Sequence, residues 1–421
     1  SRYHRPDLST ENLYRDMPAD IDTMTIASLS WREMFTDPKL QSLIETGLER
    51  NADLNVARLR VEAAEAVLMT ARLSYLPSLG LTAEGNANKH DGATAKTYNV
   101  GASASWELDI FGKLTAAKRA YRQAVQTQLV ATIADSYYTL AMLDAQMTIS
   151  NRTLENWRTT VRTLEALKKV GKSNEAGVLQ AKANVMRLEA SLLSIRKSIS
   201  ETENALSAIL AMPSHSIGRS DLAEAAFPDT VSIGVPLQLL SNRPDVRQAE
   251  MELAQAFYAT NAARAAFYPN ITLSGILGWT NNGGGVIVNP GQWLLNAIGS
   301  LTQPLFNRGV NIANLKIAKS RQEEAKLLFR QSLLNAGKEV NDALTAWQTA
   351  KSQIEINARQ VETLCDAVRK TESLMRHSNT TYLEVLTAKQ SLLEAEVQQL
   401  QTRFERIQSI IKLYHALGGG M

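Results

Sequence analysis

The chain has 421 residues, of which 44% are hydrophobic and only 6% aromatic. Its 45 basic and 42 acidic residues nearly balance and are interspersed, so the surface does not resemble a nucleic-acid-binding stripe and no nucleic acid partner is expected. The single cysteine, Cys365, excludes an internal disulfide. No run of about 18 apolar residues is present, which argues against a transmembrane helix.

Residues 1–36 form an N-terminal segment, and residues 37–76 predict helices. A pair of strands is predicted over 77–110, because apolar and polar residues alternate there. The apolar side includes Leu79, Leu81 and Ala83 in the first strand, and Tyr98, Val100, Ala102, Ala104, Trp106 and Leu108 in the second. The polar residues 89–94 predict the loop between the two strands.

A long helical hairpin is predicted over 111–211. Its outgoing helix runs from about Leu114 to Val170 and its returning helix from Asn174 to Leu210. Gly171 is a suitable stop for the outgoing helix, because glycine adopts the left-handed conformation that often ends helices. A linker over 212–240 follows.

The second half repeats this order, with a helix over 241–268 and a second strand pair over 269–306. Ile271, Leu273, Leu277 and Trp279 alternate with polar residues, the strand at about 293–305 is less regular, and the loop is predicted at 281–285. A second long hairpin over 307–417 contains a proline-free stretch from Gly309 to about Arg376, roughly 100 Å of helix at 1.5 Å per residue. The returning helix spans about 382–417, and residues 418–421 form a tail.

Three matches show that the two halves are copies of one unit. Asn51–Leu54 matches Arg243–Val246 and Ala71–Pro77 matches Ala263–Pro269, both 192 positions apart, whereas Val178–Lys182 matches Val385–Lys389 at 207. Phe111 and Ile133 are 22 positions apart, but their counterparts Phe306 and Val340 are 34 apart. We therefore expect that about 12 residues near Arg119–Ala120 are absent from this sequence.

Four alternating strands cannot close a barrel alone, and an open strand edge in lipid leaves backbone groups unpaired. If the strands lie in lipid, several chains must share one barrel. A soluble sheet packed on helices is the alternative, and a soluble coiled-coil scaffold without a channel is the corresponding alternative for the whole chain. The length of the helices favours a coiled-coil-like bundle or tube.

The chain resembles the outer-membrane efflux proteins, in their lipoprotein branch, over essentially its whole length. The residues that carry the resemblance are Trp31, Phe35, Asp37, Pro38 and Leu40, Asn51 to Leu54, Asn242 to Val246, Ala262 to Pro269, Leu301 to Phe306, Tyr382 to Leu386 and Ala416 to Gly420. The resemblance implies a mainly α fold with a membrane β-barrel. Three chains give twelve strands, and a periplasmic α-helical tunnel continues the barrel.

The resemblance also implies a passive duct in the outer membrane of a Gram-negative bacterium, exporting drugs or other small molecules. The implied partners are a periplasmic adaptor, an inner-membrane pump of the resistance-nodulation-division class and outer-membrane lipid. A duct for a type I protein secretion system is the alternative on the same fold. Family members carry a lipidated cysteine at the mature N-terminus, where this sequence has Ser1.

In the family a leucine, an acid one turn on and a basic residue close the periplasmic tip. The matching positions here are Leu383, Thr387 and Gln390, so the ionic part of that closure is absent and an apolar ring of Leu383 side chains is expected instead. The alternative is that Leu383 only packs the helix pair. The expected adaptor-contacting tips, which otherwise are solvated turns, comprise Gly171, Lys172, Ser173 and Asn174 in the first half and Arg376, His377, Ser378, Asn379 and Thr380 in the second.

No enzyme is predicted. The five histidines, His4, His90, His215, His377 and His415, show no paired metal-ligand spacing. The Gly283–Gly285 run lacks the lysine and the helix of a phosphate-binding loop. No cofactor is therefore expected.

Overall fold

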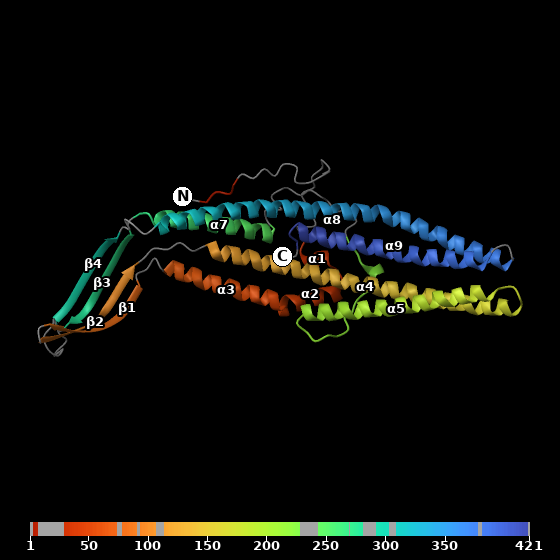
Figure 1. The fold of residues 1–421 in the computed structure, drawn as a ribbon, viewed down its shortest axis with the longest axis horizontal. Helices are drawn as coiled ribbons and strands as arrows, with labels where there is room; N and C mark the ends of the chain where they lie inside the picture. Colours follow the sequence, from red (N-terminus) through yellow and green to blue (C-terminus); the bar gives the residue numbers. More distant parts are fainter. Residues whose placement is uncertain are drawn as a thin grey trace. The chain divides into compact units, whose positions relative to one another are not determined.

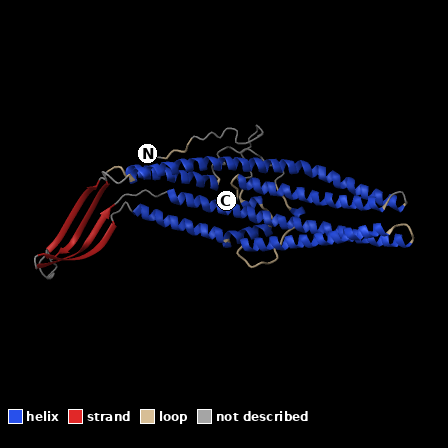
Figure 2. Cartoon of the chain, viewed as in Figure 1, coloured by secondary structure: helices blue, strands red, loops and turns tan. Residues whose placement is uncertain are grey.

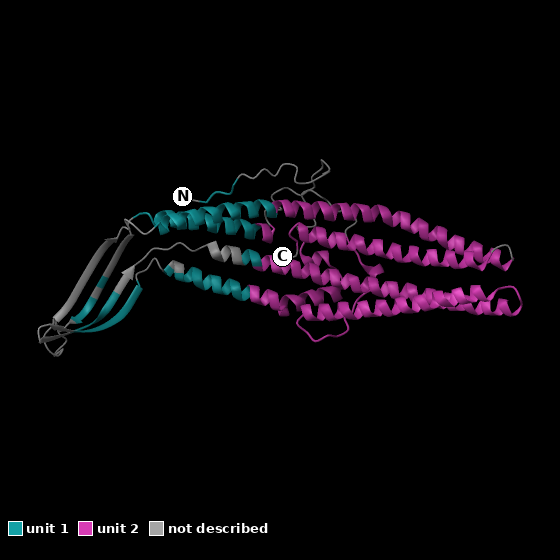
Figure 3. Cartoon of the chain, viewed as in Figure 1, with its two compact units in different colours: residues 1–8, 58–121, 247–332 teal, residues 9–57, 122–246, 333–421 magenta. Residues whose placement is uncertain are grey.

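The computed structural model describes residues 3–6, 29–73, 78–90, 93–106, 113–227, 243–268, 270–280, 292–302, 309–377 and 381–419. Most of these residues are helical, as Figures 1 and 2 show. The chain divides into two compact units, coloured in Figure 3. Unit 1 comprises residues 1–8, 58–121 and 247–332, and unit 2 comprises residues 9–57, 122–246 and 333–421.

The elements follow the predicted order in both halves. The first half contains α1 (Trp31–Met34), α2 (Pro38–Arg50), α3 (Ala52–Leu73), β1 (Ser78–His90), β2 (Ala93–Trp106), α4 (Lys113–Lys169) and α5 (Glu175–Ile209). A short 3-10 turn, η2 (Leu222–Glu224), follows. The second half contains α7 (Pro244–Ala265), β3 (Asn270–Thr280), β4 (Gln292–Thr302), α8 (Val310–Arg376) and α9 (Tyr382–Ala416).

The long helices begin and end within about a residue of their predicted bounds. None of the helices in the described ranges is both long and apolar enough to cross a membrane. The helix α4 has 57 residues and α8 has 67, so the first long helix is ten residues shorter. The absence of a segment near Arg119–Ala120 stays a prediction, which the intact mass of the natural protein checks against the 46.3 kDa of this sequence.

The four strands of unit 1 form one antiparallel sheet in the order β1-β2-β3-β4. The predicted loop at 89–94 is too long, because strand pairing continues to Lys89↔Thr94 and His90↔Ala93. Only Asp91–Gly92 then separates the strands, and Asp-Gly is a strong two-residue hairpin signal that the prediction passed over. The second predicted loop, 281–285, lies outside the described residues.

Two glycines allow the central strands to approach each other. Gly101 of β2 lies opposite Gly278 of β3. A Cβ atom at either position would run into the backbone of the facing strand. The pairing of β2 with β3, which connects the two hairpins, therefore depends on a glycine pair. The alternation of apolar residues alone did not predict this pairing.

The helical part of unit 1 is joined by polar contacts. The Thr260 hydroxyl of α7 donates to the Ala318 carbonyl of α8 at 3.2 Å. Arg119 of α4 pairs with Glu65 of α3 at 2.7 Å. The N-terminal residues lie on α7, where Arg5 binds both carboxylate oxygens of Glu250.

Besides α1 and α2, unit 2 contains two helical hairpins, formed by most of α4 with α5 and by part of α8 with α9. Apolar clusters hold α9 against the first hairpin, and the packed residues are Leu154, Trp157, Leu188, Leu192 and Leu393 in one cluster and Leu164, Val178, Ala181 and Leu386 in the other. An ion pair adds to this contact, with Arg152 of α4 and Glu396 of α9 2.6 Å apart. The same unit contains both predicted tips.

Candidate functional site: the two hairpin tips of unit 2

The first tip, between α4 and α5, is closed by backbone hydrogen bonds. Gly171 has φ of +73°, its N–H donates to the Lys168 carbonyl at 3.0 Å, and the Lys172 N–H donates to the Leu167 carbonyl at 2.9 Å. This is the pattern by which a left-handed glycine ends a helix. The predicted stop at Gly171 is confirmed.

A side-chain cap then starts α5. The Asn174 carboxamide oxygen accepts a hydrogen bond from the Gly177 N–H at 2.9 Å. Lys168 pairs with Glu175 across the turn, and Lys182 pairs with Glu165 at 2.7 Å. The hydrogen bond from Lys182 lowers the pKa of Glu165 below its ordinary value. These pairs are exposed and contribute little to stability, so the glycine stop and the asparagine cap define the tip.

The second tip is held differently. The N-cap of α9 is Thr381, whose side chain makes no capping hydrogen bond. The ring of Tyr382 packs on the cluster around Leu164 instead, and burial, aided by the charge of Glu372, raises the pKa of the tyrosine hydroxyl. The α8 helix ends at Arg376, and the His377 N–H donates to the Ser373 carbonyl at 3.3 Å. Ser378, Asn379 and Thr380 lie outside the described residues.

The three predicted gate residues share one face of α9, at spacings of four and three residues. Leu383 is 57% exposed, and the Thr387 hydroxyl, also exposed, donates to the Leu383 carbonyl at 2.9 Å. Gln390 is less free, because its oxygen accepts from Arg187 of α5 at 3.0 Å and its nitrogen donates to Glu394 at 2.6 Å. Leu383 and Thr387 are therefore available to another molecule, whereas Gln390 fixes α9 to α5.

Lys389 is a residue of this site that the sequence analysis did not select. Its side chain is only 14% exposed, and its ammonium group lies 2.6 Å from Glu372 of α8 and donates to the Thr160 hydroxyl of α4 at 2.8 Å. It thus joins three helices just above the second tip. The internal repeat is a signal for it, since Lys389 matches Lys182, which pairs with Glu165 at the first tip.

The profile of the outer membrane efflux protein family matches this sequence in two blocks, residues 43–212 and 235–419. The chain belongs to the outer membrane efflux protein family. Each block covers one half of the internal repeat. As a member of that family, the protein is an outer-membrane efflux channel.

Known relatives agree with this assignment. The chain is 32% identical over 408 residues to the cation efflux system protein CusC of Escherichia coli O6:H1, which covers 93% of this chain and 88% of CusC. It is 29% identical over 409 residues to the toluene efflux pump outer membrane protein TtgI of Pseudomonas putida, with 92% and 87% covered. The open-state crystal structure of the MtrE outer membrane channel of Neisseria gonorrhoeae matches with a TM-score of 0.86 and 28% identity, over all of this chain and 98% of MtrE.

Two arginines, Arg219 and Arg243, form ion pairs near the ends of the helical hairpins that lie away from the tips. Only Arg243 lies in a sequence motif. Arg219 holds the linker after α5 by pairing with Asp144 of α4 at 2.5 Å and with Glu203 of α5 at 2.6 Å. The hydrogen bond to Asp144 is the largest cause of the raised pKa of Arg219. A lone arginine in a linker has no distinguishing pattern. Arg243 belongs to the Asn242–Val246 motif, but the motif does not state what it binds.

Proposed function

We propose that the protein is a passive exit duct, in which three chains share one twelve-stranded barrel in the outer membrane and a helical tunnel below it. The observation that carries this proposal is the sheet of unit 1. Its β1 and β4 are edge strands, each paired on one side only within the described chain. Edge strands cannot remain open in lipid, and pooling strands from several chains removes the edges.

One face of this sheet is apolar and exposed, as a lipid-facing surface requires. Register places the side chains of this face on β1, β2 and β3 on the same side, and those exposed are Leu79, Leu81, Tyr98, Val100 and Leu277. Leu79 is 81% exposed and Leu81 is 92% exposed. Exposed leucines on one face favour a lipid environment over a soluble sheet whose apolar face is covered by helices.

Reconstitution in planar bilayers tests the duct. Purified full-length protein in detergent is expected to run as a trimer and to produce discrete, passive conductance steps after incorporation into a bilayer. A monomer that stays dissolved without detergent and produces no conductance would contradict the proposal. Either result is independent of which pump the duct serves.

We further propose that Leu383 closes the periplasmic end. A ring of three exposed leucines excludes water and ions without any charge. An ionic closure would need an acid and a base at positions 387 and 390, and this chain has Thr387 and Gln390 there. The L383S variant is expected to raise single-channel conductance. I356S, which removes an exposed apolar side chain from α8 instead of α9, is the matched control and is expected to leave conductance unchanged. Equal conductance of L383S and the wild-type protein would place the constriction elsewhere.

The exposed turns at the two tips are the proposed contacts for a periplasmic adaptor, which would connect the duct to an inner-membrane pump. Gly171 to Asn174 form the first, and Arg376 and His377 border the second. Because the relatives include both cation and toluene efflux proteins, the family does not fix the cargo. The duct is proposed to act without enzymatic chemistry, and in the described ranges no group of three His, Cys, Asp or Glu side chains is placed to hold a metal ion.

A further inference from the structure

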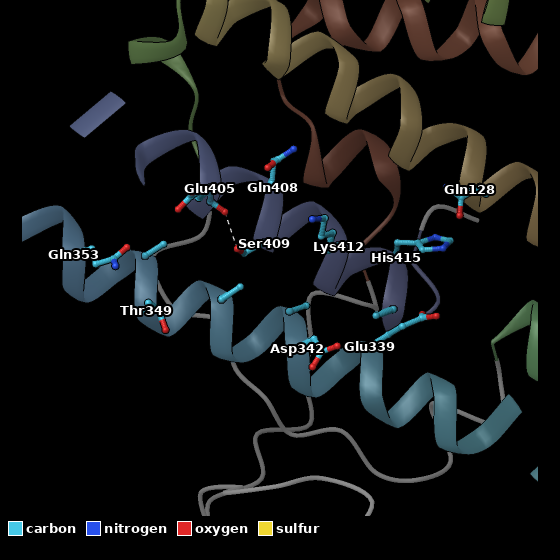
Figure 4. Close-up of a pocket in the computed structure, with 14 residues that line it drawn as sticks. Gln128, Glu339, Asp342, Thr349, Gln353, Glu405, Gln408, Ser409, Lys412 and His415 are labelled. Atoms are coloured by element: carbon cyan, nitrogen blue, oxygen red, sulfur yellow. Dashed lines mark hydrogen bonds between the residues drawn. The ribbon is translucent and has the colours of Figure 1, made fainter. Parts of the chain in front are cut away.

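Unit 2 contains a polar pocket of about 740 Å³, a size typical of sites for small molecules. One face of α8 and one face of α9 form its walls, with Gln128 of α4 beside them. Figure 4 shows Gln353 and Glu405 at one end of the pocket and Glu339 and His415 at the other. None of the residues at the tips lines it, so it is separate from the proposed gate.

The charges in this pocket are mostly negative. Three lining side chains are carboxylates and one is a cation, and they are Glu339, Asp342, Glu405 and Lys412. Glu339 and Asp342 pair with bases that do not line the pocket. The Glu405 carboxylate has neither an ion pair nor a hydrogen bond within the described residues. An excess of acidic groups in a concave site attracts cations, and Glu405 is free to bind one.

The pocket also contains hydrogen-bonding groups without charge. The side chains of Thr349 and Gln353 make no hydrogen bond within the described ranges. The Nδ1 atom of His415 is buried and has no hydrogen-bond partner there either. Burial lowers the pKa of His415, so its ring is neutral at pH 7. Because buried polar atoms are normally satisfied, the ring nitrogen indicates a ligand or water at this end of the pocket.

The remaining lining residues limit the kind of cation. Among the described residues that line the pocket none is aromatic, and the apolar ones are Ala343, Ala346, Ala350 and Ala416. Alanines accommodate methylene groups but offer no ring on which a planar cation could stack. The distance from Glu405 to His415 along α9 is about 15 Å, at 1.5 Å per residue. A long aliphatic chain with several ammonium groups matches this lining.

We propose that the pocket binds a linear polyamine, with ammonium groups beside Glu405 at one end and beside Asp342 and Glu339 at the other. The methylene segments lie on the alanines, and His415 accepts a hydrogen bond from the ligand. Lys412 lies between the two ends and limits the affinity by repulsion. This site goes beyond the proposed duct and does not depend on conduction. A bound polyamine bridges α8 and α9, so it stabilises the second hairpin.

Isothermal titration calorimetry with spermine tests the site on the full-length protein in detergent. E405Q is expected to weaken binding about fivefold and K412Q to strengthen it by a similar factor, because they remove an attractive and a repulsive charge. E362Q is the matched control, since it neutralises an exposed carboxylate of α8 that does not line the pocket, and it should leave the affinity unchanged. Putrescine, which is too short to reach both ends, is expected to bind at least about tenfold more weakly.

Equal affinities of E405Q, K412Q and the wild-type protein for spermine would overturn the proposal, because binding would then reflect surface carboxylates in general. No binding of spermine would overturn it as well.

Thermal unfolding provides a second measure. Spermine is expected to raise the melting midpoint of the wild-type protein more than that of E405Q, with magnesium chloride at equal ionic strength as the control for screening. The same rise in both proteins would contradict the site. Neither experiment involves conductance, so failure of the polyamine site leaves the proposed duct standing, and a chain that does not conduct can still bind spermine.

Discussion

Unit 2 contains two junctions at which a returning helix ends against the start of another helix. Equivalent carbonyl oxygens of the two returning helices accept hydrogen bonds from different residues there. In the first half the Asn51 carboxamide donates to the Ile209 carbonyl at 2.9 Å. In the second half the Arg243 guanidinium donates to the Ala416 carbonyl, 207 positions after Ile209, at 2.8 Å. The repeat thus preserves a donor for an otherwise unpaired helix-end carbonyl, while the residue that supplies it has changed.

The helix ends at these junctions differ in strain. Ala211 has φ of +54° and Gly418, 207 positions later, has φ of +86°. Both ends close with the same backbone bond, from Met212 to Ser207 and from Gly419 to Tyr414, each 2.9 Å long. The left-handed conformation costs an alanine roughly 1–2 kcal/mol and a glycine almost nothing. The second junction is therefore the less strained and the more charged of the two.

Removing the donors should affect the second junction more. Arg243 also pairs with Asp245 at 2.7 Å and Glu339 at 2.8 Å, and its side chain is only 5% exposed. R243A is expected to lower the free energy of unfolding by about 3 kcal/mol, because several charged hydrogen bonds are lost from a buried site. N51A, which loses one carbonyl contact and one helix cap, should cost about 1–2 kcal/mol.

Thermal unfolding followed by circular dichroism, at one protein and detergent concentration, measures both variants. R243K is the control, since it keeps the charge but cannot reproduce the forked hydrogen bonds, and it should fall between R243A and the wild-type protein. A loss for N51A equal to or larger than that for R243A would show that the charged network adds nothing to the second junction.

Exchanging the residues at the two left-handed positions should give effects of opposite sign. G418A is expected to destabilise by about 1 kcal/mol or more, because alanine is strained there although its Cβ would have room. A211G should be neutral or stabilise by up to about 1 kcal/mol, since relief of strain is offset by the greater freedom of glycine when unfolded. The same melting experiment compares them, and a destabilised A211G would mean that the methyl group of Ala211 makes a contact worth more than the strain.

The sequence predicted the elements far better than their contacts. Helical periodicity and the stop at Gly171 placed the long helices almost to the residue, and the resemblance placed Leu383 at a tip. Arg219, Arg243 and Lys389 were missed as contact residues, because their partners lie on other helices tens of positions away and charge alone does not show burial. The bounds of the fourth strand, β4, were poorly predicted because its apolar and polar residues alternate weakly. Its pairing with β3 over Gln292–Thr302 defines the strand in the structure.

The two tips offer a smaller version of the same contrast. N174A is expected to cost about 1 kcal/mol, because it removes the only side-chain cap observed at the start of α5. Thr381 makes no such cap, so T381N should add one and stabilise the start of α9 by about 0.5–1 kcal/mol. If the second tip must move to open, T381N should also shorten the open time in bilayer recordings, whereas N174A should not lengthen it. Identical gating in all three proteins would show that capping does not limit opening.

The smallest expected effect is a pH dependence at the first half's N-cap, Asp37. Burial alone would raise the pKa of this carboxyl, but hydrogen bonds from the Tyr137 hydroxyl at 2.6 Å and the Lys39 N–H at 2.9 Å hold it below its usual 3.8. A lowered folded-state pKa means that the stabilisation is present above about pH 4 and is lost as pH falls through the folded-state value. The melting midpoint should therefore fall as pH is lowered below about 4.

The hydrogen bond between Tyr137 and Asp37 is also sensitive to high pH, because the Tyr137 hydroxyl loses its proton there. Burial, and then the bond to Asp37, raise the pKa of Tyr137 to about 12, so its contribution is complete below pH 10 and is lost as pH rises towards 12. D37N should flatten the acid limb, and Y137F should flatten the alkaline limb and part of the acid one. A residual acid slope is expected in D37N, because Arg243 also lowers the pKa of Asp245 in the second half. An acid limb unchanged by D37N would mean that other carboxyl groups with lowered pKa values, such as Asp245 and Glu165, set the acid sensitivity of unit 2.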